Sequence, residues 1–246
     1  MTLNKAFASI SILFTVLFLA AWTPLETSNN SVVRLSAYDR DFCSGVVVSR
    51  IDEDWVYVAT AAHCAEATAI PMEEKVYLPN GKFKIKYYTA YPEIRVKQDK
   101  MSSEGIVGIS IDAAGYFVRE DMENDVAIYK VLAPVGYVIP ATLAVYEVKY
   151  GDKVYAMGMP FGIFGTISPG EITKPRLGKI DSIPTYIPAD AIVHTAYMKP
   201  GISGGGLFDA EGNLIGLTNW GLSGGPYIAT RVSHVIDLLK VINENK

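Results

Sequence analysis

Three side chains far apart in the sequence are of the types that together carry out acyl transfer. His63 ends an apolar run and follows small residues, Asp125 opens another apolar run, and Ser203 lies among glycines. A serine hydroxyl can attack a carbonyl carbon if a histidine takes its proton and a carboxylate orients that histidine. Each of the three alone has a plainer interpretation, as a structural histidine, a turn aspartate or a flexible turn. The hypothesis of a catalytic triad therefore depends on their occurring together.

The glycines around Ser203 suit a nucleophile. The stretch from Gly201 to Gly206 reads G-I-S-G-G-G, and missing side chains let a substrate carbonyl approach the hydroxyl closely. The backbone N–H groups of Gly201 and Ser203 could then face the oxyanion that develops on the carbonyl oxygen. We expect these two amides to form an oxyanion hole.

The same stretch also fits the G-x-S-x-G turn of the α/β-hydrolases. That fold needs an aspartate and then a histidine well downstream of the serine. Only residues 204–246 follow Ser203, and the candidates there, Asp209 and His234, are badly spaced. We therefore favour a histidine and an aspartate that precede the serine.

Short apolar runs separated by Gly, Pro, Asn and Asp predict an all-β chain. The predicted strands are 32–37, 45–50, 55–61, 105–112, 126–132, 153–158, 192–197, 214–220 and 227–232, and residues 82–96 are predicted to be β-rich. Only the C-terminal end has apolar residues at helical spacing, with Ser233 expected to cap that helix. A connection over 132–149 divides residues 31–246 into two halves, about 31–135 and 145–246.

The N-terminal segment differs from the rest of the chain. One cation, Lys5, precedes the apolar run 6–22, which is either a secretory signal peptide or an uncleaved membrane anchor near the lower limit of spanning length. Lys5 before the run and Glu26 after it favour an orientation with the N-terminus inside. We expect residues 1–30 to be this segment and its linker. Residues 31–246 would then lie outside the cytoplasm as a secreted, periplasmic or membrane-anchored domain.

The chain has only two cysteines, Cys43 and Cys64. In an exported protein they can form a disulfide, and the other interpretation is two buried free thiols. Two cysteines this far apart and three scattered histidines do not make a zinc site, so we predict no metal. A net charge of −4 without a dense stripe of Lys and Arg argues against nucleic-acid binding.

The order and spacing of these segments resemble the trypsin-like serine proteases, and within them the HtrA/DegP-like protease domain. The resemblance begins with T-A-A-H-C at 60–64 and N-D-V-A-I-Y-K-V at 124–131. More specific to the HtrA/DegP-like branch are G-D-K-V-Y-A-M-G-M-P-F-G at 151–162 and I-V-H-T-A-Y-M-K-P-G-I-S-G-G-G at 192–206. The resemblance covers the chain from about residue 31 onward, and we expect no PDZ-like domain.

The resemblance implies a fold and an activity. The fold would be two six-stranded β-barrels with a C-terminal helix, preceded here by an N-terminal hydrophobic helix. The activity would be that of a serine endopeptidase in the cleft between the barrels, with Ser203 as nucleophile, His63 as general base and Asp125 orienting His63. The partner would be a protein or peptide substrate, and neither a metal nor an organic cofactor is needed.

Substrate binding is expected beside the serine, where the resemblance places an extended peptide on a strand edge. The residues expected there are Tyr197, Pro200, Asn219, Trp220, Gly221 and Tyr227. Tyr227 could fill the primary pocket and favour a small apolar side chain, whereas Lys199 or His194 would favour an acidic one. We expect His194 instead to be a hydrogen-bonded strand residue.

Two positions depart from the pattern of the family. Ile202 stands where zymogen-type trypsins have an acidic residue before the serine, so we expect no activation by a freed N-terminus. Gly206 replaces the proline that usually follows Ser-Gly-Gly. The competing hypothesis is a catalytically silent, protease-like module that binds peptides or partners, because the presence of the three residues does not establish their alignment.

Overall fold

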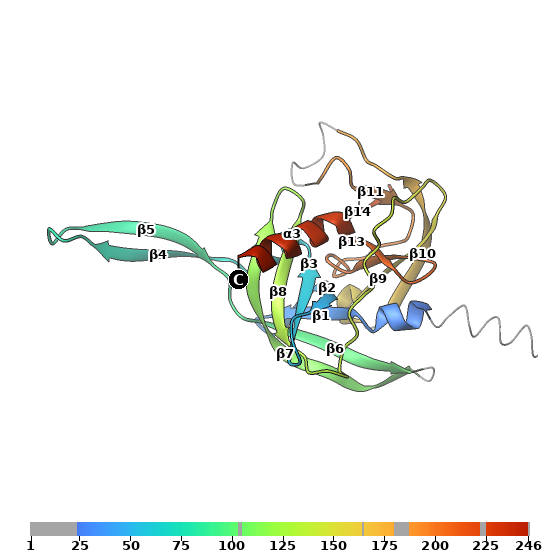
Figure 1. Cartoon of the computed structure of the whole chain (residues 1–246), viewed down its shortest axis with the longest axis horizontal. Helices are drawn as coiled ribbons and strands as arrows, with labels where there is room; N and C mark the ends of the chain where they lie inside the picture. The colour runs from blue at the N-terminus through green and yellow to red at the C-terminus, as the bar shows by residue number, and fades with distance from the viewer. Residues whose placement is uncertain (1–23, 103–104, 164, 180–186, 222–224, 246) are drawn as a thin grey trace, which may run out of the picture.

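Twelve of the fourteen strands that the structure describes form two closed six-stranded barrels, followed by a C-terminal helix (Figure 1). The computed structural model describes residues 24–102, 105–163, 165–179, 187–221 and 225–245. This architecture confirms the prediction of an all-β chain with two six-stranded barrels. The expected N-terminal hydrophobic helix and the apolar run 6–22 lie outside the described residues.

The first barrel is built entirely from antiparallel pairs and closes in the order β1-β2-β3-β8-β7-β6. Branched apolar side chains at alternate positions, such as Val33 and Leu35, fill its interior, as expected for strands with one face in a core. Its strands are β1 (Val32–Ala37), β2 (Arg40–Arg50), β3 (Trp55–Thr60), β6 (Ile94–Ser102), β7 (Gly105–Asp121) and β8 (Val126–Leu132).

The second barrel closes in the order β10-β11-β14-β13-β12-β9, again with antiparallel pairs. Its strands are β9 (Lys153–Gly158), β10 (Thr166–Lys174), β11 (Ile192–His194), β12 (Gly206–Asp209), β13 (Leu214–Gly221) and β14 (Tyr227–Arg231). A short 3-10 turn, η1 (Pro160–Gly162), follows β9.

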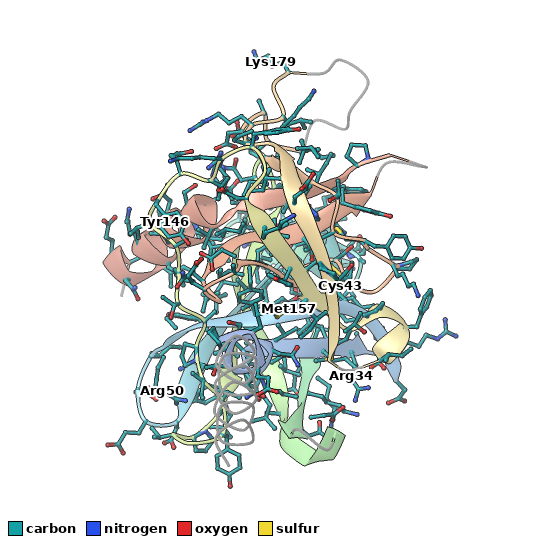
Figure 2. All side chains as sticks on the ribbon, turned by 90° about the vertical axis from the view of Figure 1, so that its right-hand side faces the viewer. Arg34, Cys43, Arg50, Tyr146, Met157 and Lys179 are labelled. Atoms are coloured by element: carbon teal, nitrogen blue, oxygen red, sulfur yellow. A yellow bond between two sulfur atoms is a disulfide. The ribbon has the colours of Figure 1, made fainter. Side chains whose placement is uncertain are left out.

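One apolar cluster spans the two barrels, in addition to the separate cluster inside the first barrel. A single cluster of buried side chains joins Val46 and Ile128 of the first barrel with Met157 and Ile202 of the second. Met157 lies near the middle of the packed side chains in the view turned by 90° (Figure 2). Because the barrels are packed through this cluster, residues from both can be held at one site between them.

The C-terminal helix α3 (Val232–Glu244) packs Val235, Leu239 and other apolar residues onto the barrels. The prediction that Ser233 caps this helix is wrong. The helix begins at Val232, and its N-cap residue, Arg231, makes no side-chain capping bond. The Arg231 guanidinium instead binds the Asp190 carbonyl and the Glu147 carboxylate, at 2.7 and 3.0 Å.

A hairpin separate from both barrels follows the first three strands. Strands β4 (Ile70–Tyr77) and β5 (Phe83–Ala90) form a two-stranded sheet that projects from the first barrel (Figure 1). The prediction that residues 82–96 are β-rich is confirmed, with β5 and β6 separated by a turn between Ala90 and Ile94, whereas β4 was not among the predicted strands. The alternation of side chains continues on both sides of that turn, so it did not mark the boundary.

The segment 24–29, which the sequence assigns to the linker, is helical and packs on the second barrel. The Ser28 hydroxyl donates to the carbonyl of Gly212 in the turn before β13, at 2.6 Å. No helix within the described ranges is long and apolar enough to cross a membrane.

Candidate active site

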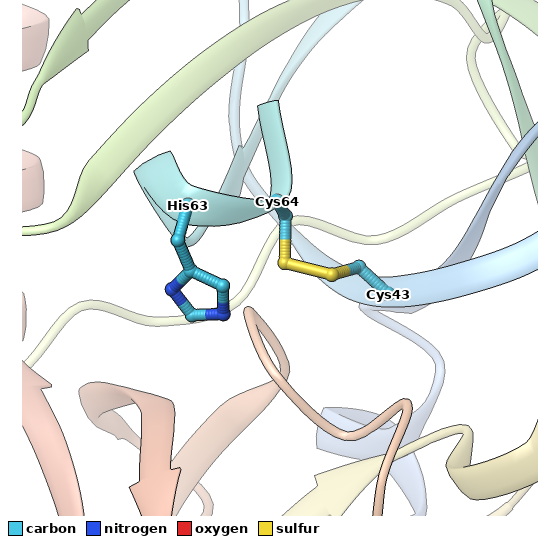
Figure 3. A group of neighbouring side chains, drawn as sticks. All are labelled: Cys43, His63 and Cys64. Carbon is cyan, nitrogen blue, oxygen red and sulfur yellow. A yellow bond between two sulfur atoms is a disulfide. The ribbon is translucent and has the colours of Figure 1, made fainter. Parts of the chain in front are cut away.

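His63 lies in the short helix α2 (Ala62–Glu66), directly after β3. The adjacent Cys64 forms a disulfide with Cys43 on β2 (Figure 3), which confirms the predicted pairing and excludes two free thiols. The sulfur atoms and a ring nitrogen of His63 lie within 4.8 Å of one another, but sulfurs bonded to each other are not thiolate metal ligands. The disulfide instead ties the turn that carries His63 to the neighbouring strand.

Asp125 binds both the ring and the backbone of His63. Its carboxylate oxygens lie 2.9 and 3.1 Å from His63 Nδ1, and one of them accepts the His63 backbone N–H at 2.9 Å. Asp125 itself has φ +53°, the left-handed conformation that few non-glycine residues adopt. The carboxylate is 1% exposed, so its hydrogen bonds replace those that water would make.

Two side chains of the second barrel complete the surroundings of Asp125. Asn219 Nδ2 and Trp220 Nε1 on β13 donate to the same carboxylate oxygen, at 2.8 and 3.0 Å. The Trp220 and His63 rings lie 4.6 Å apart, and Asn219 also donates to Thr230. Sequence reasoning assigned Asn219 and Trp220 to substrate binding and missed this contact. The feature of the sequence that could have indicated this contact is the Asn-Trp pair near the end of an otherwise largely apolar strand.

Ser203 lies at the opposite wall of the same site. Its hydroxyl donates to the backbone carbonyl of Asn219 at 3.2 Å. Among the described residues no hydrogen bond joins this hydroxyl to the His63 ring. The fold thus brings all three predicted residues to one strand, β13, with His63 and Asp125 directly bonded to each other.

The loop before Ser203 depends on glycine geometry. Gly201 and Gly204 have φ +94° and +77°, and a Cβ at Gly204 would lie 2.0 Å from the Thr60 hydroxyl and 2.5 Å from the Ser44 carbonyl. Only glycine satisfies both the conformation and the space at Gly204. The N–H groups of Gly201 and Ser203 make no hydrogen bond with any part of the chain that the structure describes.

Ser44 connects the first barrel to this loop. Its backbone N–H donates to the Ser203 carbonyl at 2.8 Å. Its hydroxyl donates to the Gly201 carbonyl and accepts the Met159 N–H, both at 2.8 Å. Sequence reasoning missed Ser44, whose one signal is its place beside the half-cystine Cys43. Two hydrogen bonds of this residue therefore fix the loop that presents Ser203, and a third holds Met159 directly after β9.

The residues expected in the primary pocket lie together. Tyr197 and Tyr227 meet edge to face with ring centroids 5.7 Å apart, and Tyr227 pairs with Gly221 across β13 and β14. Lys199 Nζ lies 5.8 Å from the Tyr197 ring. The nearby Pro200 has a different contact, because its carbonyl accepts the Phe161 N–H at 3.2 Å.

His194 lies behind these tyrosines. Its ring centroid is 6.1 Å from that of Tyr227, it is fully buried, and neither ring nitrogen makes a hydrogen bond of normal geometry. Burial lowers the pKa of His194 to about 3, and the backbone of Ala196 opposes this shift. The prediction of a strand residue is confirmed, because His194 ends β11, whereas the expected hydrogen bond of normal geometry is not found at either ring nitrogen.

Two surface cavities differ in their relation to the candidate site. One of about 180 Å³ adjoins the disulfide and the serine loop, and its lining is Asp41, Phe42, Cys43, Met159, Phe161, Pro200 and Gly201. A larger one, of about 340 Å³, surrounds the ion pair between Arg95 and Asp112 and contains none of the candidate site residues. We associate only the smaller cavity with the site, because it includes a residue of the serine loop.

Curated proteins that match part of the chain are named as proteases. The chain is 37% identical over 99 residues to "Protease Do-like 1, chloroplastic" of Arabidopsis thaliana, a match that covers 39% of the chain and 22% of that protein. It is 35% identical over 113 residues to "Probable periplasmic serine endoprotease DegP-like" of Brucella suis biovar 1 (strain 1330), covering 45% and 20%. The matched segments thus span about a fifth of the length of these curated relatives.

Solved structures share the fold at lower identity. A mutant of Rv3671c from M. tuberculosis H37Rv, in its inactive form, superposes with a TM-score of 0.63 at 20% identity, over 91% of each chain. The HtrA-type protease AlgW with a decapeptide gives 0.65 at 21% identity, over 91% of this chain and 67% of that one. The family model of the trypsin-like peptidase domain matches residues 43–217. The chain therefore belongs to the trypsin-like peptidase family.

Proposed function

We propose that the chain is a serine endopeptidase that hydrolyses peptide bonds with Ser203, His63 and Asp125. The observation that carries this proposal is the buried Asp125 carboxylate, which binds the His63 ring at 2.9 Å beside the glycine loop of Ser203. Asp125 binds one nitrogen of the His63 ring and leaves the other available for proton transfer, which is the arrangement that a general base requires.

The proposed reaction begins with Ser203. The Ser203 hydroxyl turns from the Asn219 carbonyl toward His63, which takes its proton as the oxygen attacks the scissile carbonyl carbon. Asp125 holds the ring and stabilises its charged form. His63 then gives the proton to the leaving amine, and a water molecule releases the acyl group by the same steps. Hydrogen bonds of this kind are often long without substrate and tighten in the complex.

The backbone N–H groups of Gly201 and Ser203 would stabilise the oxyanion. Both are without a partner among the described residues, which leaves them available to a substrate oxygen. Ser44 would hold the Gly201 carbonyl in place while these amides act. Removing one such donor typically costs about a hundredfold to a thousandfold in rate.

Substrate would be a peptide or protein that binds along β13 at Asn219, Trp220 and Gly221, with its primary side chain near Tyr197 and Tyr227. The solved AlgW protease carries a decapeptide, which supports peptide binding here. The apolar run 6–22, together with the relative from Brucella that is named a probable periplasmic endoprotease, supports action outside the cytoplasm. In this proposal residues 31–246 are the protease domain.

Labelling by a broad fluorophosphonate probe tests the proposal. We expect the oxidised, full-length protein to be labelled, and Ser203→Ala and His63→Ala each to abolish labelling. The competing function is a silent module that binds peptides, which the bond from Ser203 to Asn219 rather than His63 favours. Absence of labelling in the folded, oxidised protein would support that module and overturn the proposed hydrolysis.

A further inference from the structure

We propose that the β4–β5 hairpin is a second binding site of this protein, which takes an extended polypeptide segment of alternating acidic and apolar residues as a third strand along β5. The proposal rests on the proposed function in one respect, which is that the bound segment belongs to a substrate. Four observations carry it: an unfinished sheet, an apolar face, a cationic tip and a root beside His63.

The hairpin is an unfinished sheet. Its strands pair over eight residues, from Ile70 opposite Ala90 to Tyr77 opposite Phe83, and belong to neither barrel. Nearly every residue of both strands is exposed. A two-stranded hairpin alone is marginally stable in water, whereas a third strand makes such a sheet stable. The hairpin therefore has the form of a site that a further strand completes.

One face of the hairpin carries large apolar side chains in water. The register places Tyr77 opposite Phe83, and Ile85 and Tyr87 follow at alternate positions of β5 on the same face. Tyr77 and Tyr87 are both 73% exposed, Phe83 52% and Ile85 42%. Contiguous apolar surface of this kind marks interaction sites on soluble proteins.

The distal part of the hairpin is cationic, in contrast to the rest of the molecule. Residues 75–86 contain four lysines and no acidic residue, whereas the rest of the chain holds 18 basic and 26 acidic residues, a net charge of −8. The lysines are Lys75, Lys82, Lys84 and Lys86. None of them forms an ion pair with another described residue. A partner for this tip is therefore negatively charged.

The free edge of β5 determines how that partner is bound. In the turn the Leu78 N–H donates to the Lys82 carbonyl at 2.7 Å, and in an antiparallel pair such bonded positions alternate with outward ones. The main-chain groups of Phe83, Ile85 and Tyr87 consequently point away from β4. Addition of an extended peptide to such an edge is a recurring mode of recognition.

The two faces of the hairpin give the added strand its sequence pattern. Residues of the partner opposite Ile85 and Tyr87 would share the apolar face. Those opposite Lys84 and Lys86 would lie beside these two lysines on the other face, where Glu74 of β4 is the neighbour of Lys86 on the opposite side. The segment that fits thus alternates apolar and acidic residues. Lysines alone would also protect an edge against unwanted pairing, but protection does not call for four exposed apolar side chains between them.

The root of the hairpin lies beside the candidate active site. Only residues 67–69 separate α2, which holds His63, from β4. On the return, Tyr91 stacks on Phe117 with centroids 3.8 Å apart and donates to Glu120 at 2.5 Å. A polypeptide held on β5 is therefore tethered to the barrel that carries His63, which raises its local concentration at the cleft.

Fluorescence anisotropy tests the site directly. The full-length, oxidised Ser203→Ala protein, which cannot cleave the probe, is titrated against a labelled peptide of five Glu-Val repeats. We expect saturable binding that weakens about tenfold or more in Lys84→Glu/Lys86→Glu, from loss of two cross-strand charge pairs and gain of repulsion. Ile85→Pro removes an N–H group of β5 that points away from β4 and makes no hydrogen bond to it. This substitution should weaken peptide binding by a similar factor. Lys149→Glu/Lys174→Glu, an equal charge change on the body, should leave binding unchanged.

The controls separate strand addition from nonspecific attraction between charges. A peptide with five Glu followed by five Val should bind at least tenfold less tightly than the alternating one. Equal binding of both, or binding insensitive to Lys84→Glu/Lys86→Glu, overturns the proposal. The absence of peptide binding also overturns the proposal. In that case, binding to anionic lipid vesicles, or self-association, that is lost in Lys84→Glu/Lys86→Glu would identify the hairpin as a different kind of site. Fluorophosphonate labelling is measured on the same hairpin variants with Ser203 intact, so a failure of hydrolysis is recognised independently of peptide binding.

Discussion

The two walls of the candidate active site are held by different means. On one wall, side chains fix Asp125, because His63, Asn219 and Trp220 all bond to its buried carboxylate. On the other wall, the backbone fixes Ser203, through glycines of positive φ and the hydrogen bonds of Ser44. Each wall is therefore held in part by hydrogen bonds from residues of the opposite barrel. Substitutions should therefore act through charge on the first wall and through space on the second.

The largest effect is expected from Asp125→Asn. An amide cannot hold the His63 ring in the same tautomer, so the rate of fluorophosphonate labelling should fall by about 10⁴-fold. The fold should persist, because the size of the side chain is unchanged. Asp237→Asn on the exposed face of α3 is the matched control. A loss of less than tenfold in the labelling rate of Asp125→Asn would show that the charge of this carboxylate does not control the reactivity of the site.

The second wall is tested by adding one methyl group. Gly204→Ala places a Cβ 2.0 Å from the Thr60 hydroxyl at φ +77°, whereas Gly136→Ala has φ +90° and no atom within 4 Å. We expect Gly136→Ala to cost about 1–2 kcal/mol of unfolding free energy from conformation alone. Gly204→Ala should lower Tm by at least about 10 °C in a thermal melt, from added overlap. Equal melting temperatures would show that space is not what fixes the serine loop.

The two barrels also differ in their histidines, since His63 beside the first barrel has a carboxylate partner and the buried His194 of the second barrel has none. Because burial lowers the pKa of His194 from 6.5 to about 3, the folded protein keeps this ring neutral at pH values where the unfolded chain protonates it. The free energy of unfolding should therefore decline as the pH falls below 6.5, by on the order of 3 kcal/mol at pH 4. Urea unfolding at pH 7 and pH 4 measures it. His194→Leu should flatten the pH dependence, His234→Gln should not, and a wild-type profile flat over this range would contradict the assignment.

The smallest effect is expected at the link between the walls. Ser44→Ala removes the donor to the Gly201 carbonyl and leaves the Met159 N–H unpaired, at a cost of about 1–3 kcal/mol. We expect the labelling rate constant to fall about tenfold to a hundredfold while the concentration of probe at half-maximal rate stays constant. Ser44→Thr, which keeps the hydroxyl, should recover part of the rate. A change in stability alone would make Ser44 a structural residue without a positioning role.

Much of the fold could be predicted because local patterns determine it. Alternating apolar residues marked most of the barrel strands, and the resemblance of the segments around His63, Asp125 and Ser203 to the trypsin-like proteases implied two barrels. Strand β4 of the hairpin was missed because Pro71 and the charged residues 73–75 obscure its alternation, and the turn at Tyr91 was missed because the alternation of β5 continues into β6. The contacts of Ser44 and Asn219 could not be predicted, since they join positions 157 and 94 residues apart, and no local pattern encodes such distances.

The exchange of hydrogen bonds between the barrels also has a consequence for folding order. Asp125 needs β13, and the Ser203 loop needs β2, so neither half of the chain can assemble a site by itself. During synthesis or export the first barrel can form before the last strands emerge, and its His63 then has no nucleophile beside it. Reactivity should appear only with the final docking step, which makes labelling a sensitive reporter of late folding. Under the proposed function, a nascent chain would therefore be unable to cut its neighbours.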